Sequence, residues 1–441
     1  MITTTGFTSV ARLAAKAAGV EGLSIAEYPG VIGVHQAEIE EKVRSTLFDR
    51  IVDGLTRFSG KQDAAGPGRN PDAIVFAGTY DEVNAYFSEH EWTDGLPIVP
   101  PTQERVEAFL RFTDRTPDEG IAVLPQARLR ATPRNIAANA VMAGCRPQHL
   151  PILIAAVEAV ADERFNLNNI GTTWGLIPYL IVNGPIVTEL GIECRGQPIS
   201  KGPNPAIGRA FGLIIRNIAG YKPGRNQMGT FGYPLAFALA ENEADTPWDP
   251  LHVERGYARS SSTVSTGTTL NWGFPPAAYA RPDKSGGQAA LELLCIDLVR
   301  KPSLARLAEQ GPAALIHDIT FLLSPSIAKS IAANGYSKND IRKYVYENAR
   351  VPLRELEWEL KYALADVKTV PEKVSLGMYP KEFLVGSGEM VRVLPNPEII
   401  NIVVCGDPDR NRLKTLDTGY TRLTTKEITL PRNWSALLGA K

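Results

Sequence analysis

The sequence has few cysteines, and none of them belongs to a short paired motif. Four occur in 441 residues, at positions 145, 194, 295 and 405, with no C-x-x-C pair among them. Such wide spacing argues against a disulfide framework and against a zinc site built on paired cysteines. Both of these architectures are therefore set aside.

Long apolar runs and blocks of one charge are also missing. No apolar run reaches the roughly eighteen residues that a membrane-spanning helix needs, and the N-terminus lacks the pattern of a secretory signal. Basic and acidic residues number 47 and 48, and no basic block occurs. An electrostatic footprint for nucleic acid is therefore not expected. We predict a soluble, cytoplasmic protein that binds neither nucleic acid nor membrane.

Several catalytic signatures are absent as well. The chain has no G-x-G-x-x-G after a strand, no Walker loop, no G-x-S-x-G and no H-E-x-x-H. These absences weigh against nucleotide-dependent enzymes, α/β-hydrolases and zincins. The identity of any cofactor stays unknown from the sequence.

The chain falls into a small N-terminal unit, a linker and a larger body. Residues 1–60 predict a helix, a strand and an amphipathic helix with apolar residues at spacing four: Ile39, Val43, Leu47, Ile51 and Leu55. This unit is small for independent folding, and its first strand begins close to Met1, so we expect the rear half of an α/β domain. Residues 61–75, rich in Gly, Pro, Asp and Asn, predict a linker.

The body, residues 76–441, predicts a larger, helix-rich mixed α/β domain. Apolar strands alternate in it with capped helices, and a boundary near residues 275–290 would divide it further. The expected fold class is therefore α/β of mixed α+β type.

Cys145 lies in a corner between two predicted helices of this body. Thr132 and Pro133 predict the start of a helix that ends at Gly144, and Pro147 opens the next one. A thiol at a helix start can have a lowered pKa, because free N–H groups and the helix dipole stabilise the thiolate. Small apolar residues also suit such corners, so a reactive thiol and a buried filler are both open.

The densest polar stretch is ENEADTPWDPLHVERGY, residues 241–257. If its H-V-E segment is extended, His252 and Glu254 point to the same face. Carboxylates near an imidazole, such as Glu241 and Glu243 here, suit general acid–base chemistry or a divalent cation. The competing interpretation is a polar loop whose charges are simply solvated.

Two further candidates lie in loops. Asp94, in HEWTDG, is either a site carboxylate or a turn residue, and His90 before it suits a helix end. Arg209 follows GPNPAIG, which can present backbone N–H groups to an anion at a helix start. Ordinary loop geometry explains the same pattern.

Four stretches together resemble the large C-terminal region of bacterial proteins of the U-G-S-C family. They are HEWTDGLPIVPPT (90–102), AVMAGCRPQHLP (140–151), IVNGP (181–185) and the 241–257 segment. That family is named for a selenocysteine-or-cysteine motif in a smaller α/β domain, which is similar to the selenoprotein B subunit of glycine reductase. Residues 1–60 resemble the rear half of this small domain, and the redox motif itself is absent from the chain.

The resemblance implies an enzyme subunit completed by a separate small subunit that carries the missing thiol-motif half-domain. It suggests thiol-type nucleophilic or acid–base chemistry on a small polar substrate, with cleavage or formation of a C–N or C–S bond. The nucleophile would come from the partner's motif or from Cys145. His252 and Glu243 would move protons, and Asp94 would orient the substrate. The expected substrate-binding residues are Thr4, Thr5, Arg209 and Asn183.

Two alternatives stay open. One is a metal-dependent lyase or hydrolase with His252, Glu243 and Glu241 as ligands. The other is a non-catalytic scaffold that stabilises the small thiol-motif subunit.

Overall fold

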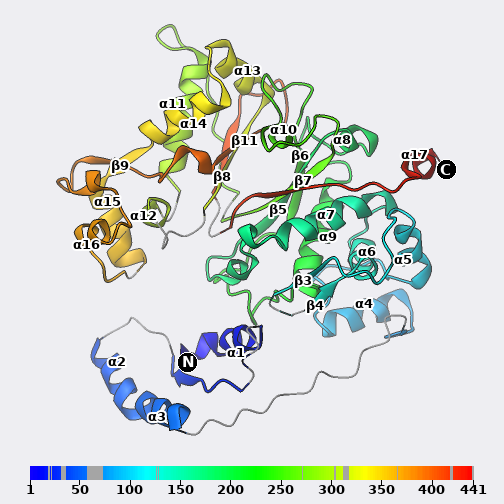
Figure 1. Ribbon diagram of the computed structural model, residues 1–441, viewed down its shortest axis with the longest axis horizontal. Helices are drawn as coiled ribbons and strands as arrows, with labels where there is room; N and C mark the ends of the chain where they lie inside the picture. The colour runs from blue at the N-terminus through cyan, green and yellow to red at the C-terminus, as the bar shows by residue number, and fades with distance from the viewer. Residues whose placement is uncertain are drawn as a thin grey trace.

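A computed structural model shows a mixed α/β protein, which confirms the expected fold class (Figure 1). It describes residues 1–17, 20, 22–30, 36–56, 73–125, 127, 129–270, 272–301, 304–310, 317–364, 366–417 and 421–439. Most of the predicted linker 61–75 lies outside these residues. In the part of the chain described, no helix is both long and apolar enough to cross a bilayer.

The N-terminal unit is a small parallel pair of strands with helices around it. Its elements are β1 (Ile2–Thr4), η1 (Thr5–Phe7), α1 (Thr8–Ala17), β2 (Ala26–Tyr28), α2 (Gln36–Lys42), the π-helical η2 (Val43–Leu47) and α3 (Phe48–Thr56). The predicted amphipathic helix is confirmed, because its stripe of Ile39, Val43, Leu47 and Ile51 packs on β2. The unit contacts the body where the Ser9 hydroxyl donates to the Arg225 carbonyl at 2.9 Å.

The first sheet of the body has the strand order β13–β7–β5–β6. The strands are β5 (Ile177–Asn183), β6 (Phe237–Ala240), β7 (Thr263–Thr269) and β13 (Thr424–Glu427). Strand β5 runs parallel to β6 and antiparallel to β7. Because side chains alternate along a strand, Leu180 and Val182 face one side of β5 and Tyr179 and Ile181 the other.

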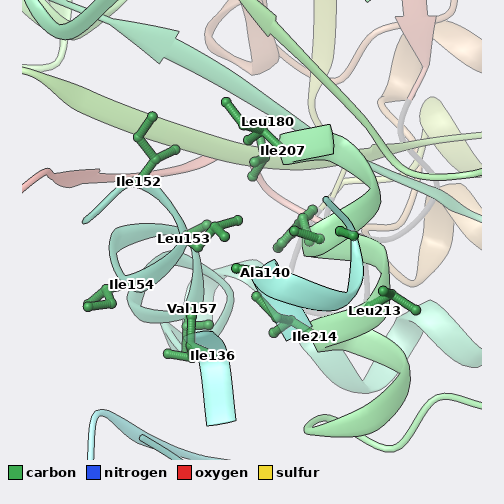
Figure 2. Close-up of a cluster of buried hydrophobic side chains, with 14 of the residues drawn as sticks. Ile136, Ala140, Ile152, Leu153, Ile154, Val157, Leu180, Ile207, Leu213 and Ile214 are labelled. Carbon is green, nitrogen blue, oxygen red and sulfur yellow. The ribbon is translucent and has the colours of Figure 1, made fainter. Parts of the chain in front are cut away.

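Helices cover the Leu180 side of this sheet. They are α6 (Pro133–Met142), α7 (Leu150–Val160) and α9 (Asn204–Asn217). Figure 2 shows their apolar side chains in one cluster with Leu180, where Ile207 lies beside Leu180 and Ile136 lies farther away, next to Val157. Gly208 lets α9 lie against β6, because a Cβ there would come within 2.6 Å of the Phe237 Cα.

A second sheet, with the order β11–β8–β12, carries its own helices. Its strands are β8 (Ile319–Leu323), β11 (Ile400–Val404) and β12 (Leu413–Asp417), and α11 (Gly286–Val299), α13 (Pro325–Ala333) and α14 (Lys338–Asn348) share a core with it. The first residue of this core in the chain is Ala278, yet β13 and Trp434 return to the first sheet and its helices. The two halves are therefore interleaved in sequence.

The two sheets pack face to face between their helices. Ile177, Tyr179 and Ile181 of β5 meet apolar residues of the second sheet, namely Leu322, Val403 and Leu416. The Tyr179 hydroxyl reaches Thr320 Oγ1 across the interface at 3.0 Å. The result is a helix–sheet–sheet–helix arrangement that holds the strand ends of both sheets together.

Shorter elements complete the body. They are α4 (Tyr80–Glu89), α5 (Gln103–Leu110), β3 (Ala122–Leu124), β4 (Leu129–Ala131), η3 (Pro147–His149), η4 (Glu163–Phe165), η5 (Leu167–Gly171), α8 (Ile186–Glu189), α10 (Leu251–Glu254), α12 (Leu304–Leu307), β9 (Arg350–Pro352), α15 (Leu353–Trp358), η6 (Glu359–Ala363), α16 (Val370–Ser375), η7 (Lys381–Phe383), β10 (Met390–Arg392), η8 (Pro397–Ile399) and α17 (Trp434–Gly439). The helices predicted on both sides of Cys145 are confirmed, with Thr132 as N-cap and Pro133 at the first position. The prediction of an extended H-V-E segment is wrong, since His252 and Glu254 lie on α10.

Candidate functional site

The strongest polar cluster lies where the parallel strands of the first sheet end. Asn183 is the last residue of β5, and Glu241 directly follows β6. In α/β sheets, ligands commonly bind beyond the carboxyl ends of the strands. The cluster therefore occupies the part of the fold where a site is most expected.

The Glu241 carboxylate contacts three segments of the chain at this point. Its Oε2 accepts hydrogen bonds from the Asn183 amide at 2.7 Å and from the Leu251 backbone N–H at 2.8 Å. Its Oε1 faces the Val404 N–H at 3.4 Å, with Lys338 Nζ 3.9 Å away. Burial raises the pKa of Glu241, and the Lys338 charge and these donors oppose that rise. The carboxylate thus links β5, α10 and β11.

Glu243 connects the cluster with solvent. Its Oε1 accepts from the Gly184 backbone N–H at 2.6 Å and from the Asn183 amide at 3.1 Å. The same oxygen lies 3.5 Å from Nδ1 of His252, and the Glu243 side chain is 22% exposed while that of His252 is fully buried. Glu243 therefore lies between the buried imidazole of His252 and the surface.

His252 is buried, and neither of its ring nitrogens makes a hydrogen bond with a described residue. Asn183 Oδ1 and Thr263 Oγ1 are likewise buried without a partner among the described residues, and these two residues lie opposite each other on β5 and β7. Buried polar groups are nearly always satisfied, so such a concentration of unmade hydrogen bonds marks a place for water or a ligand. Glu254 does not share this site, because it pairs with Lys338 and Arg342.

The alternative metal site is not supported by this geometry. Within the described residues, no group of three or more His, Cys, Asp or Glu side chains is arranged to hold a metal ion. Both oxygens of Glu241 already face N–H donors. The arrangement of His252 and Glu243 suits proton transfer instead.

Asp94 and Arg209 form a second group, on the wall of a separate pocket. Arg209 binds Asp94 with two parallel hydrogen bonds, of 2.8 and 2.9 Å, and its Nη2 also donates to the Pro97 carbonyl at 2.8 Å. Burial by itself raises the pKa of Asp94, but the bonds and charge of Arg209 outweigh it and the pKa is lowered. Asp94 is therefore an anchored carboxylate that holds the loop to α9.

For Cys145, where the sequence leaves a reactive thiol and a buried filler both open, the surroundings favour the filler. Burial raises the pKa of Cys145, and the charge of Arg209 only partly opposes this. The thiol packs against the helix core of the first sheet, before η3 begins at Pro147. His149 caps that turn: its Nδ1 accepts from the Arg146 N–H at 3.2 Å, and burial lowers its pKa to about 4.

Thr4 and Thr5 stabilise the N-terminal unit itself. The Thr5 hydroxyl donates to the Tyr28 carbonyl at 3.3 Å and accepts from the Gly30 N–H at 3.2 Å. The Thr4 carbonyl accepts from the Thr8 hydroxyl at 3.3 Å. Neither threonine lines the Asp94 pocket or contacts the strand-end cluster in the described part of the chain.

The predicted site residues thus fall into separate groups. Asn183, Glu241, Glu243 and His252 come together, whereas Asp94 and Arg209 pair elsewhere, and no hydrogen bond or ion pair between described residues joins the groups. Lys338 was missed, because it lies far away in sequence on α14. The pocket residues Arg216, Gln227 and Tyr233 were missed too, although the glycine-dense stretch 220–235 gave a signal.

Fold and site define a mixed α/β protein with a carboxylate–histidine cluster at the strand ends. Comparisons of the chain with protein-family models, with curated proteins and with solved structures gave no match.

Proposed function

We propose that this chain is a subunit of a cytoplasmic heteromeric enzyme that carries out proton transfer on a small polar substrate. The observation that carries the proposal is the buried His252 with a ring nitrogen 3.5 Å from Glu243 and no hydrogen-bond partner. A carboxylate beside a neutral or protonated imidazole is a common acid–base pair. The free state of all four cysteines is consistent with a reducing compartment.

Glu243 is the group that meets the substrate in this proposal. The Gly184 N–H and the Asn183 amide donate to its Oε1, which fixes the direction of the carboxylate. His252 lies behind it and exchanges a proton with it. Asn183, whose Oδ1 is unpartnered, then orients the substrate or a bound water.

The nucleophile, in this proposal, comes from a small partner subunit that carries the thiol-motif half-domain. The raised pKa of Cys145 supports this assignment, because a protonated thiol is a weak nucleophile. The N-terminal unit also exposes large apolar side chains that another half-domain can cover. Ile2 is 57% exposed, Phe48 60% and Leu55 81%.

The test is turnover of a pool of small amino, hydroxy and thiol metabolites by the native complex, followed by mass spectrometry. His252→Gln and Glu243→Gln should each lower the rate about 100-fold or more, because a general acid–base group contributes that much. His90→Gln is the matched control, since His90 is exposed at the end of α4. A folded His252→Gln complex with the wild-type rate would contradict the acid–base proposal and favour a non-catalytic scaffold.

The partner is tested separately by purification of the chain from its native source. We expect a small subunit with a thiol motif to co-purify in a fixed ratio. Leu55→Asp and Phe48→Asp should release it, because both place a charge on the exposed apolar face of α3. A lone chain with full turnover would refute the heteromeric part of the proposal and leave the acid–base part standing.

A further inference from the structure

A cavity of about 190 Å³ lies beside α9, at the opposite end of β6 from the strand-end cluster. Its walls are Asp94, the α9 residues Arg209, Gly212 and Arg216, and the loop that leads into β6. That loop contributes Gly224, Gly229 and Gly232, so much of the wall is bare backbone. The volume suits a small organic molecule better than a large cofactor.

The cavity contains a hydrogen-bond donor that no described residue satisfies. Gln227 is 3% exposed, and its Nε2 has no hydrogen-bond partner in the part of the chain that the structure describes. The Tyr233 hydroxyl donates to Gln227 Oε1 at 2.5 Å, which fixes the orientation of the amide and leaves its N–H groups available. A buried unsatisfied donor costs about 1–3 kcal/mol, so a ligand acceptor here is worth a comparable amount.

A positive charge without a carboxylate partner lies in the same wall. Arg216 donates through Nε to the Glu91 carbonyl at 2.9 Å, and its terminal nitrogens make no hydrogen bond or ion pair with any described residue. Arg209 differs, since Asp94 neutralises it. Lys222 and Arg225 nearby both lie within ion-pair distance of Glu91. Because Lys222 and Arg225 share the single carboxylate of Glu91, they add one further positive charge just outside the lining. Within the lining itself, Arg216 is the cation without a carboxylate partner among the described residues.

The net charge of the cavity lining indicates the class of ligand. The lining holds two guanidinium groups, Arg209 and Arg216, and one carboxylate, Asp94, so two positive charges less one negative charge leave one positive charge. A monoanion balances this, whereas a phosphate dianion would leave one negative charge beside Asp94. A planar carboxylate also fits the paired terminal nitrogens of a guanidinium.

We propose that this cavity binds a small carboxylate-bearing molecule, with its carboxylate on Arg216 and Gln227. The site is independent of the acid–base cluster. It lies next to the N-terminal unit, because the Arg225 carbonyl that Ser9 binds belongs to the same loop.

Binding is tested with the full chain and lactate, with lactamide as the neutral analogue and inorganic phosphate as the dianion. Ligand-observed NMR and calorimetry at low salt should show saturable lactate binding, and lactamide and phosphate should bind at least about tenfold more weakly. Lactate should also raise the thermal midpoint in proportion to its binding. Absence of lactate binding, or equal binding of phosphate or lactamide, overturns the proposal.

Variants locate the site. Arg216→Gln and Gln227→Leu should each weaken lactate binding at least about tenfold, because each removes donors to the carboxylate. Gln227→Leu removes an unsatisfied buried amide but also takes the acceptor from the Tyr233 hydroxyl, so the two effects oppose each other and the thermal midpoint without ligand should change little. Arg225→Gln is the matched control, with the same change of charge outside the cavity lining. Unchanged lactate binding by a folded Arg216→Gln protein places the ligand elsewhere and overturns the assignment.

Discussion

The two ends of β6 carry polar groups that are satisfied in opposite ways. At the carboxyl end, Glu241 is buried and its oxygens face donors from three chain segments. At the other end, the Asp94–Arg209 pair leaves Arg216 and Gln227 with hydrogen-bonding groups directed at open space. The protein itself satisfies the Glu241 carboxylate, although the neighbouring His252 ring is left without a partner among the described residues. On the pocket wall, the charged group Arg216 and the Gln227 amide are completed only by something that binds.

This difference separates stability from binding. A buried charge is costly to leave unpaired, so loss of a partner at the carboxyl end should act on folding. Uncommitted donors on a pocket wall contribute little to folding, so their loss should act on a ligand. Substitutions at the two ends of β6 therefore test whether the carboxyl end acts on folding stability and the other end on ligand binding.

The largest effect is expected at Glu241. Glu241→Ala should lower the free energy of unfolding by about 3–5 kcal/mol, because the Leu251 N–H and the Asn183 amide lose their acceptor inside the protein. Urea denaturation measures this. Glu243→Gln is the control and should cost less than half as much, since Glu243 is partly exposed. Equal costs would show that the cluster is not buried as a unit.

A smaller effect is expected at Asp94. Asp94→Asn should cost about 2 kcal/mol, because the guanidinium of Arg209 loses its charged partner in a partly buried place. The same urea experiment checks it. A cost as large as that of Glu241→Ala would remove the contrast between the two ends.

The pH dependence of stability should have opposite signs at the two carboxylates. The pKa of Asp94 is lowered in the folded protein, so its contribution is present above the unfolded pKa of about 4 and is lost as the pH falls below it. The pKa of Glu241 is raised, so its contribution is lost as the pH rises above about 4.3. Asp94→Asn should reduce the loss of folding stability as the pH falls below about 4. Glu241→Gln should reduce the loss of folding stability as the pH rises above about 4.3.

His252 should show little or no loss of stability. His252→Leu removes two unsatisfied ring nitrogens from a buried position, so the thermal midpoint should stay constant or rise slightly. Differential scanning calorimetry measures it. A loss of more than about 2 kcal/mol would mean that the ring is held by interactions that resemble those of Glu241.

The smallest effect concerns Cys145. Because burial raises its pKa, iodoacetamide at pH 8 should alkylate it far more slowly than a free cysteine peptide. Peptide mapping by mass spectrometry gives the rate, with the protein unfolded in urea as control. Rapid alkylation in the native state would restore Cys145 as a candidate nucleophile.

Local patterns predicted much of the helical structure and part of the site. Thr79 with Glu82, and Thr132 with Pro133, start α4 and α6 as expected, because capping depends on neighbours within one turn. The 241–257 segment gave Glu241, Glu243 and His252, which do come together. Their partners Asn183 and Lys338 lie on other elements. For Lys338, only the packing of α14 beside the second sheet reveals the contact.

Strand β7 shows what local patterns do not contain. The run SSSTVSTGTT consists mostly of Ser and Thr, yet Thr263–Thr269 within it is a fully buried strand. It is paired on both sides, by β5 and β13. Some of its hydroxyls meet those of β13, as in Ser265 with Thr425 at 2.7 Å and Thr266 with Thr424 at 3.1 Å. Burial of a hydroxyl is costly unless a neighbour satisfies it, and here the neighbouring strand does so for these two residues.

The helix starts, the apolar strands and the residue types available for acid–base chemistry can be predicted from the sequence, because they depend on spacing within a few residues. Which polar groups are buried, paired or unsatisfied depends on the tertiary structure. Burial among side chains of the helix core raises the pKa of Cys145, and Asp94 pairs with Arg209, so among the described residues Arg216 has no carboxylate partner. Desolvation and pairing depend on neighbours that are distant in sequence, and only the packed fold supplies them.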